Sequence, residues 1–271
     1  MKNKNLIIVG KKSFLGTNIF KSLKIKKKII LSYNEFCKLD DNTISKFNYI
    51  CNCAVKKNYK NKKYSTRNDI DVLISQRITK FNIKYIFLSS RKVYQPKYNL
   101  NENDLTKPID QYSKNKVITE NYLKKNLKNN VLILRISNII GLKLKKNYRK
   151  INDTFFDNYL KLLKKNKKII FNNFFKDFIS IDQFTKTFSL ILKYDLKGIY
   201  NLSLGKKIYL SEIIGWLNSN NKNRENFKPS KKILNIDSFT LNNNKLYKKI
   251  NYKPKKIDLK KFCLRLSKKI H

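Results

Sequence analysis

The chain has 271 residues and carries 62 Lys and Arg against 18 Asp and Glu, so its formal charge is +44. Its hydrophobic fraction of 41% is large enough for a buried core, which argues against a wholly disordered chain. The only histidine is His271 and the four cysteines lack paired spacing, so neither a histidine-based triad nor a Cys/His zinc site is expected, and no metal.

The first half of the chain alternates short apolar runs with stretches of helical periodicity, which is typical of βαβ units around a parallel sheet. We expect strands at 5–9, 28–32, 49–53, 85–89 and 131–135, and helices at 14–23, 69–80 and 112–127. These elements predict an α/β fold with a doubly wound, Rossmann-type parallel sheet. Ligands of such a sheet bind beyond the carboxyl ends of its strands.

From about residue 141 the pattern changes. After a basic segment at 143–150 we expect helices at 151–163, 182–192 and 210–217, and short strands at 169–171, 178–180 and 198–202. Asp182 is the expected N-cap of its helix. The polar stretch 218–228 predicts an exposed loop, and 255–269 predicts an amphipathic surface helix. We therefore expect a Rossmann domain at 1–142 and a small C-terminal α/β module at 143–271, with 178–202 returning to the sheet.

The first candidate motif is a glycine turn, Gly10-Lys11-Lys12-Ser13-Phe14-Leu15-Gly16, between the first strand and the first helix. Such a turn needs glycine where the backbone bends sharply and where the helix approaches the sheet. Its amides and the helix N-terminus can then bind a pyrophosphate. Ser13 stands at the middle position of a G-x-x-G-x-x-G pattern, so an ordinary strand–helix turn explains the segment equally well.

A second candidate set joins Tyr112 and Lys116, four residues apart on one face of a predicted helix, with Ser90 at the end of a strand. An ammonium beside a phenol stabilises the phenolate, which can exchange a proton with a substrate hydroxyl. Each signal is weak alone, because lysine is abundant here and a strand-end serine is often only a cap. The predicted strand order nevertheless brings all of them to the sheet edge that carries the glycine turn.

In their order and spacing these motifs resemble the extended short-chain dehydrogenase/reductase family, in its branch of NAD-dependent nucleotide-sugar epimerases and dehydratases. The resemblance runs along nearly the whole chain, and the common order of the motifs is far more specific than any one of them. The matching segments are IIVGKKSFLG (7–16), NCA (52–54), FLSSRKVY (87–94), NENDLTKP (101–108), YSKNK (112–116), LRISNIIG (134–141), KDFISID (176–182) and GIYNL (198–202).

The resemblance implies that Tyr112 is the general acid/base, that Lys116 stabilises its anion and holds the nicotinamide ribose, and that Ser90 hydrogen-bonds the reacting oxygen. It implies that Asn138 and the C-terminal module bind a nucleotide-diphosphate sugar, and that hydride passes between the nicotinamide and a sugar carbon. A homodimer is expected from the family alone. The implied cofactor-binding residues are Gly10, Ser13, Phe14, Leu15, Gly16, Asp40, Cys53, Ala54, Tyr112 and Lys116.

Two departures from the family pattern narrow the expected chemistry. Arg91 and Lys92 stand where 4,6-dehydratases carry an Asp-Glu pair, which argues against a dehydratase. A reductase similar to the dTDP-4-dehydrorhamnose reductases, or an epimerase, remains, in either case for surface polysaccharide; the short module favours the reductase slightly. Residues 32–34 provide no acidic group for the ribose of NAD at the end of the second strand, so NAD and NADP both stay open.

The high positive charge keeps a different class of function open, a non-catalytic relative that binds nucleic acid or senses NADP without turnover. Scattered lysines and a single alanine, Ala54, indicate a biased genome rather than a dedicated polyanion site. The complete set of Ser90, Tyr112 and Lys116 also argues against a pure binding module. No apolar run reaches the ~18 residues of a membrane span, and run 6–9 is too short for a signal peptide, so we expect a cytoplasmic protein with no membrane partner.

Overall fold

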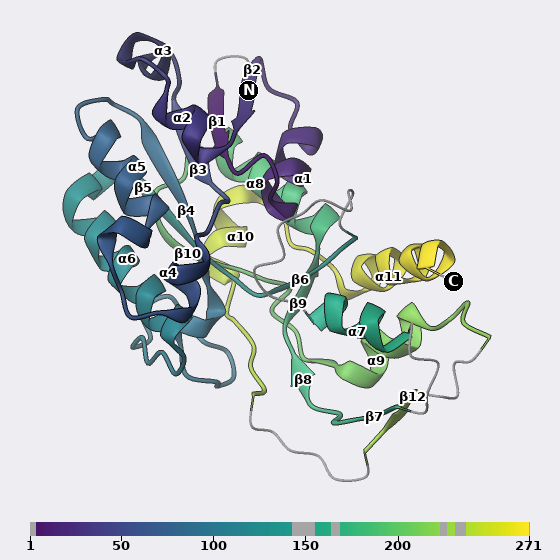
Figure 1. The fold of residues 1–271 in the computed structure, drawn as a ribbon. Coiled ribbons are helices and arrows are strands. Elements are labelled where there is room, and N and C mark those ends of the chain that lie inside the picture. The colour runs from purple at the N-terminus through teal and green to yellow at the C-terminus, as the bar shows by residue number, and fades with distance from the viewer. Residues whose placement is uncertain (1–3, 143–154, 164–168, 223–226, 231–236, 271) are drawn as a thin grey trace.

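A six-stranded parallel sheet forms the centre of the protein (Figure 1). The computed structural model describes residues 4–142, 155–163, 169–222, 227–230 and 237–270. The strand order β10-β5-β4-β3-β1-β2 confirms the predicted doubly wound α/β fold. Its strands are β1 (Asn5–Val9), β2 (Lys27–Leu31), β3 (Tyr49–Asn52), β4 (Lys84–Ser90), β5 (Val131–Ile136) and β10 (Gly198–Leu202).

Helices cover both faces of this sheet, which is why its strands read as continuous apolar runs. In β1, Leu6 and Ile8 point to one face and Ile7 and Val9 to the other, and all four are fully buried. Helices α1 (Phe14–Ser22), α8 (Ile181–Lys193) and α10 (Asn244–Ile250) cover the first face, and α2 (Tyr33–Cys37), α3 (Asp41–Ser45), α5 (Ile70–Ile78) and α6 (Gln111–Leu127) cover the second.

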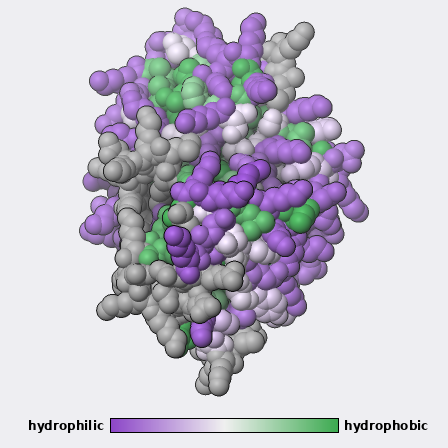
Figure 2. All heavy atoms as spheres, turned by 90° about the vertical axis from the view of Figure 1, so that its right-hand side faces the viewer, coloured by the Kyte–Doolittle hydropathy of each residue, from purple (hydrophilic) through white to green (hydrophobic). Residues whose placement is uncertain are grey.

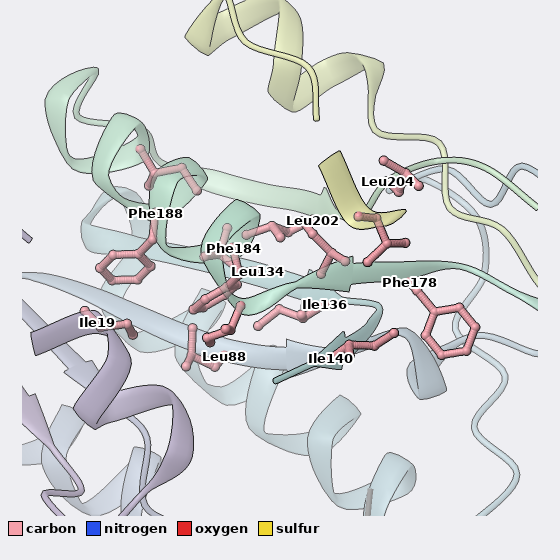
Figure 3. Packing of buried hydrophobic residues seen from close by; sticks show 14 of the residues in the cluster. Ile19, Leu88, Leu134, Ile136, Ile140, Phe178, Phe184, Phe188, Leu202 and Leu204 are labelled. Carbon is pink, nitrogen blue, oxygen red and sulfur yellow. The ribbon is translucent and has the colours of Figure 1, made fainter. Parts of the chain in front are cut away.

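The core between the sheet and the first helical layer is built from large apolar side chains. Figure 3 shows Phe184 and Phe188 of α8 and Ile19 of α1 lying over Leu134 of β5 and Leu88 of β4. Four of these five side chains have no more than 1% of their surface exposed. This packing fixes the position of α1, and with it the start of that helix beside the end of β1.

The N-cap of α8 is Ser180, so the predicted cap at Asp182 is wrong. Ser180 Oγ accepts a hydrogen bond from Gln183 N at 3.1 Å, and Gln183 Oε1 accepts one from Ser180 N at 3.1 Å, which forms a reciprocal capping box. Strand β9 (Phe178–Ser180) ends at this serine, and the helix begins at the next residue. Asp182 lies in the first turn and pairs instead with Arg265 of α11 (Lys256–Ile270).

Most of the remaining elements form a smaller C-terminal module around three two-stranded sheets. Strand β6 (Asn138–Ile140) pairs with β9, β8 (Phe175–Lys176) with β11 (Ile208–Tyr209), and β7 (Ile169–Phe171) with β12 (Phe227–Pro229). The module contains the helices α7 (Phe155–Leu163), α9 (Leu210–Leu217) and α11. Four short elements lie in the first half of the chain instead: α4 (Lys57–Asn61) and the 3-10 turns η1 (Thr66–Asn68), η2 (Arg91–Val93) and η3 (Lys128–Asn130).

One expectation for this module is wrong, and another falls partly outside the described residues. The stretch 218–228 is not loop throughout, because Phe227 begins β12, where its ring lies 5.7 Å from that of Tyr159. The predicted helix 151–163 is described from Phe155 onward, whereas the basic segment 143–150 lies outside the described residues. Within 178–202, β10 is an edge strand of the large sheet and β9 pairs outside it.

Asp177 joins the module to the sheet at the junction of β8 and β9. Its carboxylate is fully buried and accepts hydrogen bonds from the backbone amides of Leu204, Gly205 and Leu241. Burial raises the pKa of Asp177 to about 7, although these bonds act in the opposite direction. The carboxylate therefore ties the segment after β10 and the segment before α10 to one point.

The surface of the module side is mainly hydrophilic, with hydrophobic groups in small separate patches (Figure 2). Among the described residues, no helix is long and apolar enough to cross a membrane. In the same part of the chain, no group of three or more His, Cys, Asp or Glu side chains is arranged to hold a metal ion.

Candidate active site

The glycine turn places bare backbone at the carboxyl end of β1. Gly10 has a φ of 119° and donates its amide to Leu31 O at the end of β2, at 2.6 Å. A Cβ on Gly10 would lie 2.9 Å from Ala54 N, and a Cβ on Gly16 would lie 2.7 Å from Gly10 O. Both positions therefore require glycine, because the surrounding atoms are backbone that cannot move aside cheaply.

Ser13 replaces the middle glycine of the pattern by acting as the N-cap of α1. Its Oγ accepts a hydrogen bond from Gly16 N at 2.9 Å. The amides of Phe14 and Leu15 lie in the same first turn, where an α-helix has no carbonyl partners of its own and carries partial positive charge. With bare backbone on one side and these amides on the other, the turn fits the pyrophosphate of a dinucleotide.

Tyr112 and Lys116 are brought together at the start of α6. Asp110 caps this helix, accepting a hydrogen bond from Ser113 N at 2.8 Å, and so places Tyr112 in its first turn. Lys116 follows one turn later, with its Nζ 5.8 Å from the centre of the Tyr112 ring. The Lys116 side chain is almost completely buried and donates a hydrogen bond to Leu88 O of β4 at 3.0 Å. This bond holds the pair against the carboxyl end of the sheet.

Ser90 and Asn138 lie at the ends of neighbouring elements. Ser90 is the last residue of β4, where its Oγ accepts a hydrogen bond from Lys92 N at 3.2 Å and caps η2. Asn138 is the first residue of β6, and its side chain donates to Asp177 O at 3.3 Å. Both side chains are half-buried. Each thus has a structural partner, and their contacts with a substrate stay predictions.

The other predicted cofactor residues divide into two groups. Cys53 and Ala54 follow β3 directly and lie against the glycine turn: Cys53 N donates to Val9 O at 2.7 Å. Asp40 is exposed and caps α3, where its carboxylate accepts hydrogen bonds from the amide and hydroxyl of Thr43, which lower the pKa of Asp40. A contact of Asp40 with adenine stays a prediction.

An acidic residue that the sequence reasoning missed stands one position beyond the segment 32–34. Glu35 is in the first turn of α2, and its carboxylate accepts hydrogen bonds from the amide and hydroxyl of Ser32, at 2.7 and 2.8 Å. It also forms an ion pair with Lys11 of the glycine turn. The bond from Lys11 lowers the pKa of Glu35 to about 2. The S-x-x-E capping box directly after β2 is the sequence signal that identifies this residue.

Two further charged side chains near the pair gave no signal in the sequence. Lys60 of α4 places its Nζ 5.4 Å from the centre of the Tyr112 ring. Asp71 of α5 is buried with its carboxylate 3.9 Å from Lys116 Nζ, and it accepts a hydrogen bond from Tyr85 OH at 2.7 Å. Neither residue belongs to a recognisable motif, because both reach the site through packing of separate helices.

The fold and these motifs define the class of protein. The model of the NAD dependent epimerase/dehydratase family matches residues 6–203, and the chain belongs to this family. It is thus an enzyme of the extended short-chain dehydrogenase/reductase type. No curated protein matches the chain.

Several solved structures have the same fold. A UDP-N-acetylglucosamine 4-epimerase from Methanobrevibacter ruminantium M1, in complex with UDP-N-acetylmuramic acid, is 20% identical with a TM-score of 0.78, covering 99% of this chain and 98% of that one. A UDP-glucuronic acid 4-epimerase from Bacillus cereus, in complex with NAD, is 14% identical with a TM-score of 0.76, covering 98% and 99%. A dTDP-glucose 4,6-dehydratase from Bacillus anthracis, also with NAD, is 15% identical with a TM-score of 0.74, covering 98% and 97%.

Proposed function

We propose that this protein is an NAD-dependent epimerase or keto-reductase of a nucleotide-diphosphate sugar that serves as a donor for surface polysaccharide. The observation that carries the proposal is the Tyr112–Lys116 pair, held by Leu88 O at the sheet edge that also bears the glycine turn. The turn would hold the pyrophosphate of a bound dinucleotide at the start of α1. Family membership and the similar folds of the sugar-nucleotide epimerases support the same conclusion.

Tyr112, Lys116 and Ser90 have different roles in proton transfer. Bound NAD supplies the acceptor and donor of hydride. Tyr112 takes the proton from the sugar hydroxyl at its phenol oxygen when the sugar is oxidised, and returns it on reduction. The buried ammonium of Lys116 stabilises the phenolate, and Ser90 donates a hydrogen bond to the reacting oxygen. Asn138 contacts the sugar from the β6 side.

Elimination of water is not part of this proposal, although a 4,6-dehydratase has a similar fold. The two positions where dehydratases carry acid and base are Arg91 and Lys92, which are cationic and already engaged. Arg91 pairs with Asp237 at 2.7 Å, and Lys92 pairs with Asp110 at 2.6 Å. Neither side chain is a carboxyl group that can give up and take back a proton at neutral pH.

Glu35 supports NAD rather than NADP as the cofactor. Its carboxylate lies beside the glycine turn at the end of β2, where a negative charge accepts a hydrogen bond from a ribose hydroxyl and repels a 2′-phosphate. The pairing with Lys11 offsets part of that repulsion. We therefore propose a preference for NAD and not an absolute selection.

Coenzyme titration followed by product analysis tests the proposal. We expect the purified protein to bind NADH saturably, more tightly than NADPH, at both low and moderate salt. We then expect it to epimerise UDP-N-acetylglucosamine or UDP-glucuronic acid, or to reduce a 4-keto sugar nucleotide, with the product identified by NMR. Binding that vanishes at moderate salt would indicate general attraction of anions to a chain of charge +44, and it would contradict the proposal.

Gly16→Ala is expected to weaken NADH binding by about tenfold or more, equivalent to about 1.4 kcal/mol. The new Cβ meets Gly10 O at 2.7 Å, so the turn must open at the place where the pyrophosphate binds. Gly215→Ala is the matched control, because Gly215 is also helical and a Cβ there meets nothing within 4 Å. Fluorescence titration of both variants measures the effect; equal affinities would show that the turn does not hold the coenzyme.

A further inference from the structure

The ring of Tyr112 has two ammonium groups near it. Lys116 lies at 5.8 Å from the ring centre and reaches it from the same helix, α6. Lys60 lies closer, at 5.4 Å, and comes from α4, which follows β3 in the chain. Tyr59, next to Lys60, packs its ring edge-on against the Tyr112 ring with their centres 6.4 Å apart. The contact between Tyr59 and Tyr112 fixes the short helix that carries Lys60.

The ammonium of Lys60 is partly desolvated, with two other cations and one carboxylate near it. Charged groups that act on it include Lys92 of η2 and, from α6, Asp110 at its N-cap and Lys116; Asp110 is itself bound by Lys92. Burial, together with Lys92 and Lys116, lowers the pKa of Lys60 to about 8. The ammonium is therefore still charged at neutral pH, and a negative charge that forms beside it will be stabilised.

The position of the Lys60 ammonium over the ring suits an anion on Tyr112. An ammonium above an aromatic ring is attracted to the ring face even when the phenol is neutral. The attraction grows when the phenol loses its proton, because the anion spreads its charge into the ring. Half-burial of both side chains limits screening by water.

We propose that Lys60 is a second lysine of the acid/base centre, whose ammonium stabilises the phenolate of Tyr112 together with Lys116. This rests on the proposed function of Tyr112 as the group that moves the proton. Two cations from separate helices then stabilise the phenolate, whereas the sequence motif assigns this role to Lys116 alone. Because the charge of Lys60 is lost through about pH 8, its contribution is largest at neutral pH and declines above that pH.

The first test uses the protein without coenzyme and measures the ionised form of tyrosine directly. Ultraviolet absorbance followed against pH will contain a step that Tyr112→Phe removes. We expect Lys60→Met to move the part of that step below about pH 8, where Lys60 carries its charge, upward by about 0.5–1 pH unit. Lys63→Met, the same change of charge at an exposed position of the same segment, is expected to leave the step in place. Lys60→Arg, which keeps the charge, is expected to restore the wild-type position.

The second test follows turnover with a nucleotide-sugar substrate. In Lys60→Met the acidic limb of the kcat profile is expected to move upward by the same amount, with KM changed by less than about twofold. An unmoved step and limb, an equal shift in Lys63→Met, or a change of KM alone would overturn the proposal. If Lys60→Met fails to fold, Lys60→Gln takes its place. A wild-type protein without turnover refutes the proposed function, while the absorbance test still decides the role of Lys60.

Discussion

Tyr112→Phe is expected to lower kcat by about 10²- to 10⁴-fold, with NADH affinity changed by less than about twofold. The substitution removes only the phenol oxygen, the atom that we propose moves the proton. The ring and its contact with Tyr59 remain, and Lys116 still has its bond to Leu88 O. The glycine turn at the start of α1 is unchanged, so coenzyme binding is expected to remain while turnover falls.

Tyr122→Phe is the matched control for this experiment. Tyr122 is also half-buried in α6, but it packs in the hydrophobic cluster between the second face of the sheet and its helices. Its loss of a hydroxyl is expected to leave kcat within about twofold. Steady-state rates and fluorescence titration of both variants give the comparison. A fall in kcat of less than about tenfold for Tyr112→Phe would remove Tyr112 from the proposed mechanism.

The largest loss of stability is expected at the buried ion pair of Arg135 and Glu120. Arg135 of β5 donates to Glu120 of α6 through Nη2 at 2.7 Å and Nε at 3.1 Å, and both side chains are less than 5% exposed. Arg135 also donates to Tyr94 OH, and Ser89 Oγ donates to Glu120. Replacing Glu120 by Leu leaves a buried guanidinium without its counter-ion, which is expected to cost about 3–5 kcal/mol.

Urea unfolding measures this cost, and an exposed pair provides the control. Arg265 and Asp182 lie 2.8 Å apart, a separation similar to that of the buried pair, but their side chains are 65% and 61% exposed. Arg265→Met is therefore expected to cost less than about 1 kcal/mol. The double variant Glu120→Leu with Arg135→Met is expected to cost less than the sum of its single changes, because no charge is left unpaired. Additive costs would show that the pair is not coupled.

This pair matters for the site because Glu120 lies one turn beyond Lys116 on the same helix. Its bonds to Arg135 attach α6 to β5, as the bond of Lys116 to Leu88 O attaches it to β4. The proposed acid/base group is therefore held by a buried network on two strands. Rigid support of this kind keeps reacting groups within the narrow range of positions that proton transfer needs.

The periodicity of apolar residues and the spacing of motifs predict much of the fold. The strands of the large sheet are buried on both faces, so their apolar runs stand out, and each predicted boundary lies within one residue of the observed one. Tyr112 and Lys116 meet because a helix brings residues four apart onto one face, a relation that needs no distant contact. The need for glycine at position 16 likewise follows from the local turn, because its Cβ would meet Gly10 O, whereas at position 10 it also depends on Ala54 after β3.

Elements whose ends depend on distant partners are harder to predict from the sequence. The N-cap of α8 is Ser180 and not Asp182, because the end of β9 sets where the helix begins. Phe227 is in a strand because β7 provides its partner, and no periodicity within 218–228 reveals that partner. A short polar segment has too few local interactions to decide its own structure, so tertiary pairing decides it.

The Rossmann fold, the family and the candidate residues Ser90, Tyr112 and Lys116 can be predicted from sequence, since they depend on periodicity and on the order of local motifs. Which of the many lysines and acids lie near these residues depends on how distant elements pack. Lys60 reaches Tyr112 because α4 packs on α6, and Glu35 reaches Lys11 because β2 lies beside β1. In a chain so rich in lysine, composition cannot distinguish a charge that acts from one that is solvated; the distances between packed elements can.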